Sequence, residues 1–589
     1  MSRHPDSIAV PARGRAGAHV ASQLMRGACG GGGGAGTAPP PTVSGIATGG
    51  LAAPTLTVSS VKRLDLRWPA QPAATAIRVL VDPDDAGPAP ESPLPDLPGN
   101  ATGHALEVFL PTARQAAYRI EVCVGPDCTR SAQARVGGPL AEGVGYLKAA
   151  LPTPDAAMGT DLALSADGQT LAVGSRPGGP SPGAGEVAVY TRTGIGTWVL
   201  QTTVRAPNAE AGDRFGVVVA LSANGQTLAV GATGEDGSAS AHPTLADNND
   251  LPGSGAVYVF ERQGTDWALT AYLKSHTPET DRGFGYAVDL SADGATLLVA
   301  SERKPLAGER VEVFAGTGAS RVFDAALPLT GALSDESVSL SGDGLTVALG
   351  AYLDSSGGTG VYPAPLTDST SPQSGAVHVW ARGTTGWTFQ AYLKSARPHE
   401  GAEFGSSVDL SHSGDTLAIG SAGDDGGPDG VPNEALHDRS GAAHVFQRSG
   451  GVWTQTDELK APVADRFDQM GQVVALSGDG LTVALGVPYE DGAGHGVTAD
   501  PNDNSETERG AVWLFRRVAG AWGTGQFIKP SQTGAMDLSS QFGWSVALSY
   551  PGTTLAVGAR GQSDGASGVV TDPTRYSGGT WSSGAAYLY

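Results

Sequence analysis

Hydrophobic and polar residues alternate at a period of two in short runs along most of this chain, and one such run recurs. It reads Leu-Ser, a short turn, then Thr-Leu-Ala-Val-Gly or a close variant. Alternation of this kind is typical of strands with one buried face, bounded by turn residues. The copies begin at Leu164, Leu221, Leu290, Leu340, Leu410, Leu476 and Leu548. Seven copies predict a repeat architecture whose activity resides in the segments that differ between copies.

Each full copy contains four strand-like segments. The fifth copy supplies the first three at 404–410, 415–420 and 441–446, and 387–394 is the fourth strand of the copy before it. Residues 143–589 hold the seven copies, which gives about 64 residues to each. Four antiparallel strands in each of seven units predict an all-β fold built around a seven-bladed β-propeller.

The sequence also predicts how this ring closes. The last copy ends at Tyr589 without a fourth strand, whereas an orphan segment, 145–150, precedes the first copy. This segment is similar to the fourth-strand sequence Ala-Tyr-Leu-Lys, which begins at Ala271 and at Ala391. We therefore expect strand 145–150 to complete the last blade, which would remove two exposed sheet edges.

Two further motifs accompany the repeat. Phe-Gly or Met-Gly opens the first strand of six copies, at Met158, Phe215, Phe284, Phe404, Met470 and Phe542. Gly-Ala-Val or a variant opens the third strand at Gly255, Gly375, Gly441, Gly510 and Gly584. On these motifs, residues 143–589 resemble the FG-GAP repeat family, in its bacterial version related to the integrin α-subunit propeller. Each turn keeps at most one carboxylate, so the calcium loops of integrin-type repeats are not carried over.

Residues 53–137 show a different strand pattern before the repeat. Alternating runs lie at 64–68, 77–81, 105–110 and 118–124, which predicts a small β-sandwich. The segment resembles a fibronectin type III module, with Trp68 on an early strand and Tyr118 on a late one. Another kind of β-sandwich stays open as the alternative.

The chain has three cysteines. Cys123 and Cys128 flank a four-residue turn, which would place them opposite each other in a hairpin at disulfide distance. A disulfide implies an oxidising compartment, and two free thiols or a metal pair are the alternatives.

Cys29 precedes a polyglycine run within residues 1–52, which we interpret as a leader followed by a flexible tether. The arrangement resembles the mature start of a bacterial lipoprotein and implies lipidation of Cys29, although Arg26 stands where Leu is expected. A misassigned start or a disordered segment are the alternatives. We expect the protein to be exported, and either secreted or held at the cell surface by an outer-membrane tether.

The net charge of −22 argues against nucleic-acid binding, because phosphates repel an acidic surface. No run of 18 apolar residues is present, so the only membrane contact we expect is a lipid anchor. Much of the net negative charge lies in five long connections between second and third strands, at 232–254, 351–374, 421–440, 487–509 and 559–583. Their formal charges sum to −15.

Three of these connections are rich in the oxygen ligands that calcium prefers. We predict calcium as a candidate cofactor there, and plain solvated acidic loops are the alternative. The candidate ligands are Glu235, Asp236, Asp247, Asp250, Asp424, Asp425, Asp429, Glu490, Asp491, Asp500, Asn502, Asp503 and Asn504.

No HExxH, GxSxG or P-loop motif occurs, so the sequence predicts no enzymatic activity and no catalytic residues. We expect a monomeric, non-enzymatic binding or adhesion protein that holds a protein or glycan ligand on its acidic long-loop face. A glycan-active hydrolase or lyase on a propeller scaffold and a structural envelope protein are the alternatives.

Overall fold

The computed structural model describes residues 47–48, 50–83, 92–137, 140–176, 183–238, 249–302, 310–328, 337–427, 438–531, 539–570 and 579–589. The chain divides into two units, Met1–Ile46 and Ala47–Tyr589, of which the first, with Cys29, lies outside the described residues. Apart from one short helix and three 3₁₀ turns, the regular elements of the described residues are strands, paired antiparallel except for β1 with β9. The prediction of an all-β fold is therefore confirmed. No helix among the described residues is long and apolar enough to cross a membrane.

Two sheets form between residues 47 and 135. The three-stranded sheet contains β2 (Thr55–Ser60), β3 (Arg63–Arg67) and β7 (Gly103–Glu107). The seven-stranded sheet contains β1 (Ala47–Thr48), β4 (Ala76–Asp82), β5 (Ser92–Pro93), β6 (Leu97–Pro98), β8 (Ala117–Val124), β9 (Asp127–Arg130) and β10 (Ala134–Arg135). Trp68 and Tyr118 are both buried.

One strand in this region ends earlier than its sequence predicts. The run 105–110 alternates, but β7 ends at Glu107 and helix α1 (Leu110–Ala113) follows. Pro111 lies in the first turn of α1, where its missing N–H leaves no helical hydrogen bond unmade. The prediction of a strand to Leu110 is therefore wrong at its end.

Seven antiparallel sheets follow in chain order, numbered here 1 to 7. Sheet 1 contains β12 (Met158–Leu164), β13 (Thr170–Ser175), β14 (Glu186–Gly194) and β15 (Thr197–Val204). Sheet 2 contains β16 (Phe215–Leu221), β17 (Thr227–Ala232), β18 (Ala256–Gln263) and β19 (Asp266–Leu273). Sheet 3 contains β20 (Phe284–Leu290), β21 (Thr296–Ser301), β22 (Arg310–Ala315) and β23 (Val322–Pro328). Sheet 4 contains β24 (Val338–Leu340), β25 (Thr346–Ala351), β26 (Gly360–Tyr362), β27 (Ala376–Gly383) and β28 (Gly386–Lys394). Sheet 5 contains β29 (Phe404–Leu410), β30 (Thr416–Ser421), β31 (Ala442–Ser449) and β32 (Val452–Leu459).

Sheet 6 contains β33 (Val473–Leu476), β34 (Thr482–Val487), β35 (Ala511–Val518), β36 (Ala521–Trp522) and β37 (Gln526–Ile528). Sheet 7 contains β38 (Phe542–Leu548), β39 (Leu555–Ala559), β40 (Gly568–Val570) and β41 (Ala585–Leu588), together with β11 (Gly145–Lys148) from before sheet 1. Strand β11 pairs with β41 on one side and with β40 on the other, so the two ends of this region share one sheet.

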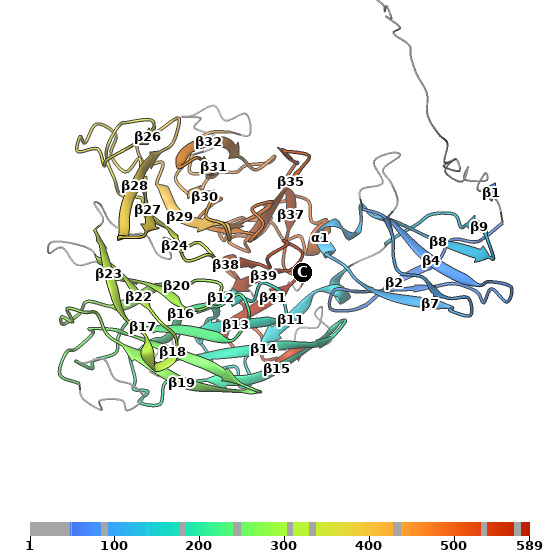
Figure 1. The fold of residues 1–589 in the computed structure, drawn as a ribbon, viewed down its shortest axis with the longest axis horizontal. Helices are drawn as coiled ribbons and strands as arrows, with labels where there is room; N and C mark the ends of the chain where they lie inside the picture. Colours follow the sequence, from blue (N-terminus) through green and yellow to red (C-terminus); the bar gives the residue numbers. More distant parts are fainter. Residues whose placement is uncertain are drawn as a thin grey trace, which may run out of the picture. The chain divides into compact units, whose positions relative to one another are not determined.

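The first strands of the seven sheets contact one another in order. Strand β12 contacts β16, β16 contacts β20, and the series continues to β38, which contacts β12. Figure 1 shows β12, β16, β20 and β38 close together, with the other strands of their sheets extending outward.

The recurring Leu-Ser sequence has a local structural cause. The Ser222 hydroxyl accepts the N–H of Thr227 at 2.9 Å and donates to Asn224 Oδ1 at 2.8 Å, which holds the turn between the first and second strands. Ser222 is 0% exposed, so its polar group is satisfied within the turn it stabilises.

Glycines allow adjacent sheets to approach closely. A Cβ at Gly231, on the second strand of sheet 2, would lie 2.1 Å from the carbonyl oxygen of Gly285 on the first strand of sheet 3. The same approach joins sheet 7 to sheet 1, where a Cβ at Gly558 would lie 2.2 Å from the Gly159 carbonyl oxygen. Sheet 3 carries Ala300 at this position, and the sheet that follows it is the one without Phe-Gly.

Aromatic side chains fill the space beside these glycines. Phe215 and Phe542 are 0% exposed and meet Tyr258 and Tyr587 edge to face, with ring centroids 5.3 Å apart in each pair. The motif aromatics are therefore core residues.

Candidate functional site

Five lysines with little exposed side-chain surface form ion pairs or hydrogen bonds between the five long connections and their sheets. In sheet 2, Lys274 follows the fourth strand, and its Nζ lies 2.8 Å from Glu235 Oε2 and donates to Ser254 Oγ at 2.6 Å. Glu235 lies near the start of the connection and Ser254 near its end. Both charged side chains are at most 4% exposed, so one cation ties the two ends of the loop to the strand.

The same arrangement recurs in the other sheets with long connections. Lys394 pairs with Asp354 at 3.4 Å and donates to Ser374 Oγ at 2.9 Å. The remaining contacts join Lys460 to Asp424, Lys529 to Glu490, and Lys148 to Ser583 Oγ. We call these five residues the anchor lysines.

The anchor lysines occur only where the connection is long. The chain has seven lysines in all, so most of its lysines serve this purpose. Sheets 1 and 3, with short connections, carry Arg205 and Pro328 at the corresponding positions. Arg205 is largely exposed and pairs instead with Glu186 at the edge of its own sheet.

The predicted ligands in the sheet 2 connection are separated by these contacts. Glu235 is held by Lys274, and Asp236 Oδ1 accepts the N–H of Gly253 at 2.6 Å. Asp250 is exposed, and Asp247 lies outside the described residues.

In the sheet 5 connection, Asp424 lies between Lys460 and His399, whose Nε2 is 3.5 Å from Asp424 Oδ2 and 3.4 Å from Asp425 Oδ1. Burial of Asp424 favours its protonated form, but the nearby His399 imidazole and the charge of Lys460 outweigh it and hold the pKa of Asp424 below its ordinary value. Asp429 lies outside the described residues.

In the sheet 6 connection, Lys529 pairs with Glu490. The other predicted ligands contact their own loop: Asp491 Oδ1 accepts the N–H of Glu508 at 2.9 Å, Asp500 Oδ1 accepts the N–H of Asn502 at 3.0 Å, and Asp503 Oδ1 accepts the N–H of Ser505 at 3.1 Å. Asn504 is exposed.

Across the described parts of these connections, no three carboxylate or imidazole groups converge closely enough to hold one metal ion. The carboxylate nearest each sheet already faces an ammonium group, which would compete with calcium for it. Calcium binding stays a prediction. Asp354 and the anchor lysines were not predicted, although Tyr-Leu-Lys ends the fourth strand in three of the five sheets with long connections.

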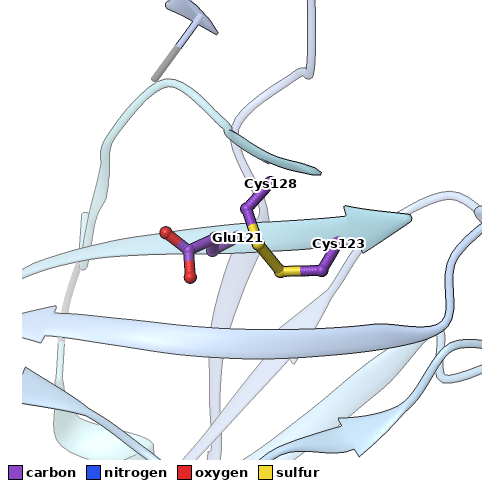
Figure 2. A group of neighbouring side chains, drawn as sticks. All are labelled: Glu121, Cys123 and Cys128. Carbon is purple, nitrogen blue, oxygen red and sulfur yellow. A yellow bond between two sulfur atoms is a disulfide. The ribbon is translucent and has the colours of Figure 1, made fainter. Parts of the chain in front are cut away.

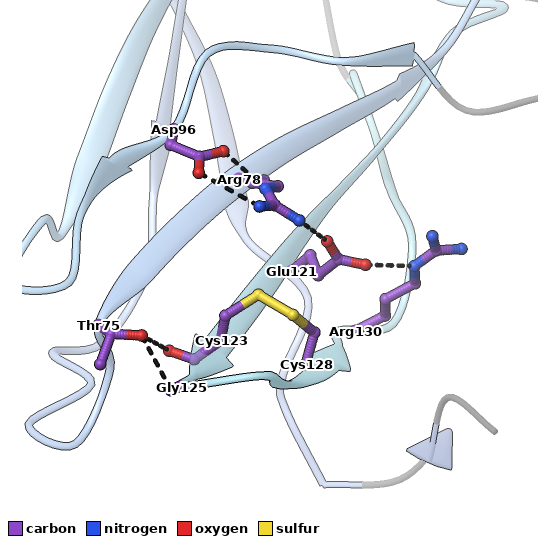
Figure 3. Close-up of a disulfide and its surroundings, with 8 residues drawn as sticks. All are labelled: Thr75, Arg78, Asp96, Glu121, Cys123, Gly125, Cys128 and Arg130. Atoms are coloured by element: carbon purple, nitrogen blue, oxygen red, sulfur yellow. Dashed lines mark hydrogen bonds and ion pairs between the residues drawn. A yellow bond between two sulfur atoms is a disulfide. The ribbon is translucent and has the colours of Figure 1, made fainter. Parts of the chain in front are cut away.

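The predicted disulfide joins Cys123 on β8 to Cys128 on β9 and is confirmed, with the two Cα atoms 4.0 Å apart. Glu121 lies beside it (Figure 2). The Glu121 carboxylate accepts hydrogen bonds from Arg130 at 3.0 Å and Arg78 at 3.2 Å (Figure 3). Oxidised sulfurs and a carboxylate held by two guanidinium groups do not make a metal site.

Three aspartates on first strands lie between neighbouring sheets, Asp161 buried and Asp289 and Asp409 half-buried. Asp289 Oδ2 accepts the N–H of Leu340 from sheet 4 at 2.7 Å, and Asp161 and Asp409 accept N–H groups of the following sheet in the same way. Burial raises the pKa of each carboxyl to about 7, against the opposing effect of these hydrogen bonds. The neighbouring charge of Asp289 adds to the effect on Asp161 and Asp409.

This burial predicts a stability that falls as pH rises. A carboxyl whose pKa is raised from 3.8 to about 7 on folding stabilises the folded state at low pH, and that contribution is lost between these two values. We expect the free energy of unfolding to decrease from about pH 4 to about pH 7, and Asp289→Asn to reduce that decrease by on the order of 1 kcal/mol. Urea titrations across this range measure the slope. An unchanged slope in the variant would contradict the prediction.

Comparison with known protein families identifies one part of the chain. Residues 198–260 match the FG-GAP repeat family model. The matched segment runs from the fourth strand of sheet 1 to the third strand of sheet 2. Together with the seven successive sheets, it supports a β-propeller architecture. A comparison with curated proteins finds no match.

Several solved structures resemble the chain at low sequence identity. They include the periplasmic gluconolactonase PpgL of Pseudomonas aeruginosa, at 14% identity, covering 70% of this chain and 94% of that one with a TM-score of 0.38. A putative 6-phosphogluconolactonase from Bacteroides uniformis matches at 11% identity, covering 77% of this chain and 97% of that one with a TM-score of 0.37. Hydrazine synthase of Kuenenia stuttgartiensis matches at 13% identity, covering 72% and 96% with a TM-score of 0.38.

These names correct one prediction. The absence of short catalytic motifs led to the expectation that the chain is not an enzyme, and that exclusion is wrong because proteins named as gluconolactonases are among the similar structures. The physical reason is that a propeller brings side chains from distant repeats together, so a catalytic set there need not form a contiguous motif.

Proposed function

We propose that residues 143–589 form a closed, seven-bladed propeller of FG-GAP repeats, of the integrin α-subunit type. The cyclic contacts of the first strands and the pairing of β11 with β41 support this proposal. We further propose that residues 53–137 are a fibronectin type III-like module. The disulfide supports export to an oxidising compartment, since such bonds persist there.

We propose that the protein binds a protein or glycan ligand on the face formed by the five long connections. The observation that carries this proposal is the set of anchor lysines, four of them buried and Lys460 with a side chain 6% exposed, each present only where the connection is long. A loop with no role has no need of a buried ionic tether, because burying a charge is unfavourable unless it is well paired.

Anchoring also prepares these loops for binding. A loop held at both ends loses less conformational entropy when it meets a ligand, which favours affinity and specificity. The acid left at the surface includes Asp250 and Asp500, which are exposed. We therefore expect a ligand with basic groups around its contact surface.

The test is a binding screen of the full chain against immobilised fibronectin, collagen, laminin and a glycan array, with and without calcium. For a ligand found there, we expect the double variant Asp500→Asn, Asp503→Asn to bind about three- to tenfold more weakly, because charges at the rim of an interface contribute only modestly to affinity. Biolayer interferometry at low and high salt measures the difference.

Asp266→Asn is the matched control, because Asp266 is exposed at the start of β19, at the opposite end of the strands from the long connections. We expect this variant to bind as the parent does. Equal affinity of the double variant and the parent would contradict the proposed face, and an absence of any ligand in the screen would favour a structural envelope protein.

A further inference from the structure

A cavity of about 240 Å³ opens where sheets 7, 1, 2 and 3 meet. Arg176, Glu302 and Arg560 enter it from the ends of second strands, where the second-to-third connections begin. Arg214 enters from just before the first strand of sheet 2, and Tyr286 and Trp544 from first strands. The cavity therefore lies at the inner edge of the long-loop face.

The charge of this cavity is opposite to that of the chain. Three arginines and one glutamate give the cavity a formal charge of +2, whereas the whole protein carries −22. Neither Arg176 nor Arg214 forms an ion pair with any carboxylate of the described residues. Acidic proteins have many carboxylates with which to neutralise a guanidinium, so two unneutralised arginines in one cavity suggest a role for their charge.

The third arginine is fixed in place. The Arg560 guanidinium stacks on the Trp544 ring, and its Nε donates to Gln541 Oε1 at 2.7 Å. A stacked, hydrogen-bonded guanidinium loses little freedom when it meets an anion. The half-buried Tyr286 and the exposed Glu302 add groups that can exchange hydrogen bonds with hydroxyls.

The fold does not require arginine at position 214. This residue has a left-handed backbone, with φ of 58°, as does every described residue that precedes Phe-Gly or Met-Gly. The same position holds Gly283 in sheet 3, Gln469 in sheet 6 and Gln541 in sheet 7. Glutamine is thus an accepted residue at this backbone conformation, and the arginine is free to serve another purpose.

We infer that this cavity binds a small polyhydroxylated organic anion, a sugar acid or a sugar phosphate. Planar guanidinium groups bind carboxylate and phosphate oxygens through paired, charge-assisted hydrogen bonds. The volume is close to the lower limit of small-molecule sites, roughly 300 Å³, which suits a single sugar unit and not a chain. The inference is independent of the proposed function, since it concerns a cavity and not the outer loops.

Calorimetric titration of the full chain with D-glucuronate, D-glucose 6-phosphate and D-glucose tests the inference. We expect at least one anionic sugar to bind, and glucose to bind at least about tenfold more weakly, because it lacks the charged group. Binding of glucuronate alone assigns a carboxylate ligand, and binding of the phosphate ester alone assigns a phosphate ligand.

Arg214→Gln should weaken binding of the anionic sugar by about tenfold or more, with the melting temperature unchanged. Arg517→Gln is the matched control, because Arg517 lies at the far end of β35 and donates to the Gly520 carbonyl at 3.1 Å, away from the cavity. An absence of heat with both anionic sugars at millimolar concentration would overturn the inference. So would equal affinity of the parent and the double variant Arg176→Gln, Arg214→Gln.

Discussion

Replacing Lys274 with Met should destabilise the protein by about 3 kcal/mol or more, because it leaves the Glu235 carboxylate buried without a cation. Glu235 is 3% exposed and would keep neutral donors such as the Gly237 N–H at 2.9 Å and the Asn208 amide at 3.2 Å. Burial lowers the pKa of Lys274 in the parent, and the nearby charge of Glu235 opposes this effect. Urea denaturation followed by tryptophan fluorescence measures the loss.

The double variant Lys274→Met, Glu235→Gln separates this cause from simple loss of packing. Glutamine keeps an oxygen to accept the Gly237 N–H but carries no charge, so we expect it to recover most of the lost stability. Arg205→Met is the control, because Arg205 occupies the corresponding position in sheet 1 and is largely exposed. We expect it to change stability by less than about 1 kcal/mol. A Lys274→Met variant as stable as the parent would show that the anchor contributes nothing.

Much of the strand structure follows from local patterns. The Leu-Ser turn is a local hydrogen-bonded unit, and the strands beside it alternate, so sequence reasoning locates them within a residue or two. Strands β26 and β40 were not predicted, since they are three-residue segments within long connections and carry no clear alternation. They form because β28 and β11 offer them free edges, which is a property of the folded sheets and not of the local sequence.

The candidate sites were harder to predict, because they depend on which residues meet in space. Counting charge along a loop treats every carboxylate as exposed, yet Glu235, Asp354, Asp424 and Glu490 each face a lysine from outside the counted segment. The cavity arginines lie 38 and 346 residues apart along the chain (Arg176 to Arg214, and Arg214 to Arg560). No spacing rule would join them, because only the approach of sheet 7 to sheet 1 brings them to one cavity.

Gly231→Ala tests the close approach of neighbouring sheets. The added Cβ would lie 2.1 Å from the Gly285 carbonyl oxygen and 2.6 Å from Val218 Cγ1. The carbonyl belongs to the backbone of the next sheet and cannot rotate away, so the two sheets must separate locally. We expect a loss of about 2–3 kcal/mol, at the upper end of overpacking effects, measured as a lower urea midpoint.

The reverse change at the equivalent position of sheet 3 is the matched control. Ala300 already carries a Cβ there and lies next to the sheet without Phe-Gly, so Ala300→Gly relieves no clash. We expect it to cost only about 0.5–1 kcal/mol, the usual penalty of glycine within a strand. If both substitutions cost the same, side-chain volume at this position does not limit the approach of the sheets. If Gly231→Ala lowers the free energy of unfolding much more than Ala300→Gly does, then Gly231 and the Phe-Gly glycine of the next repeat, Gly285, pack as one unit.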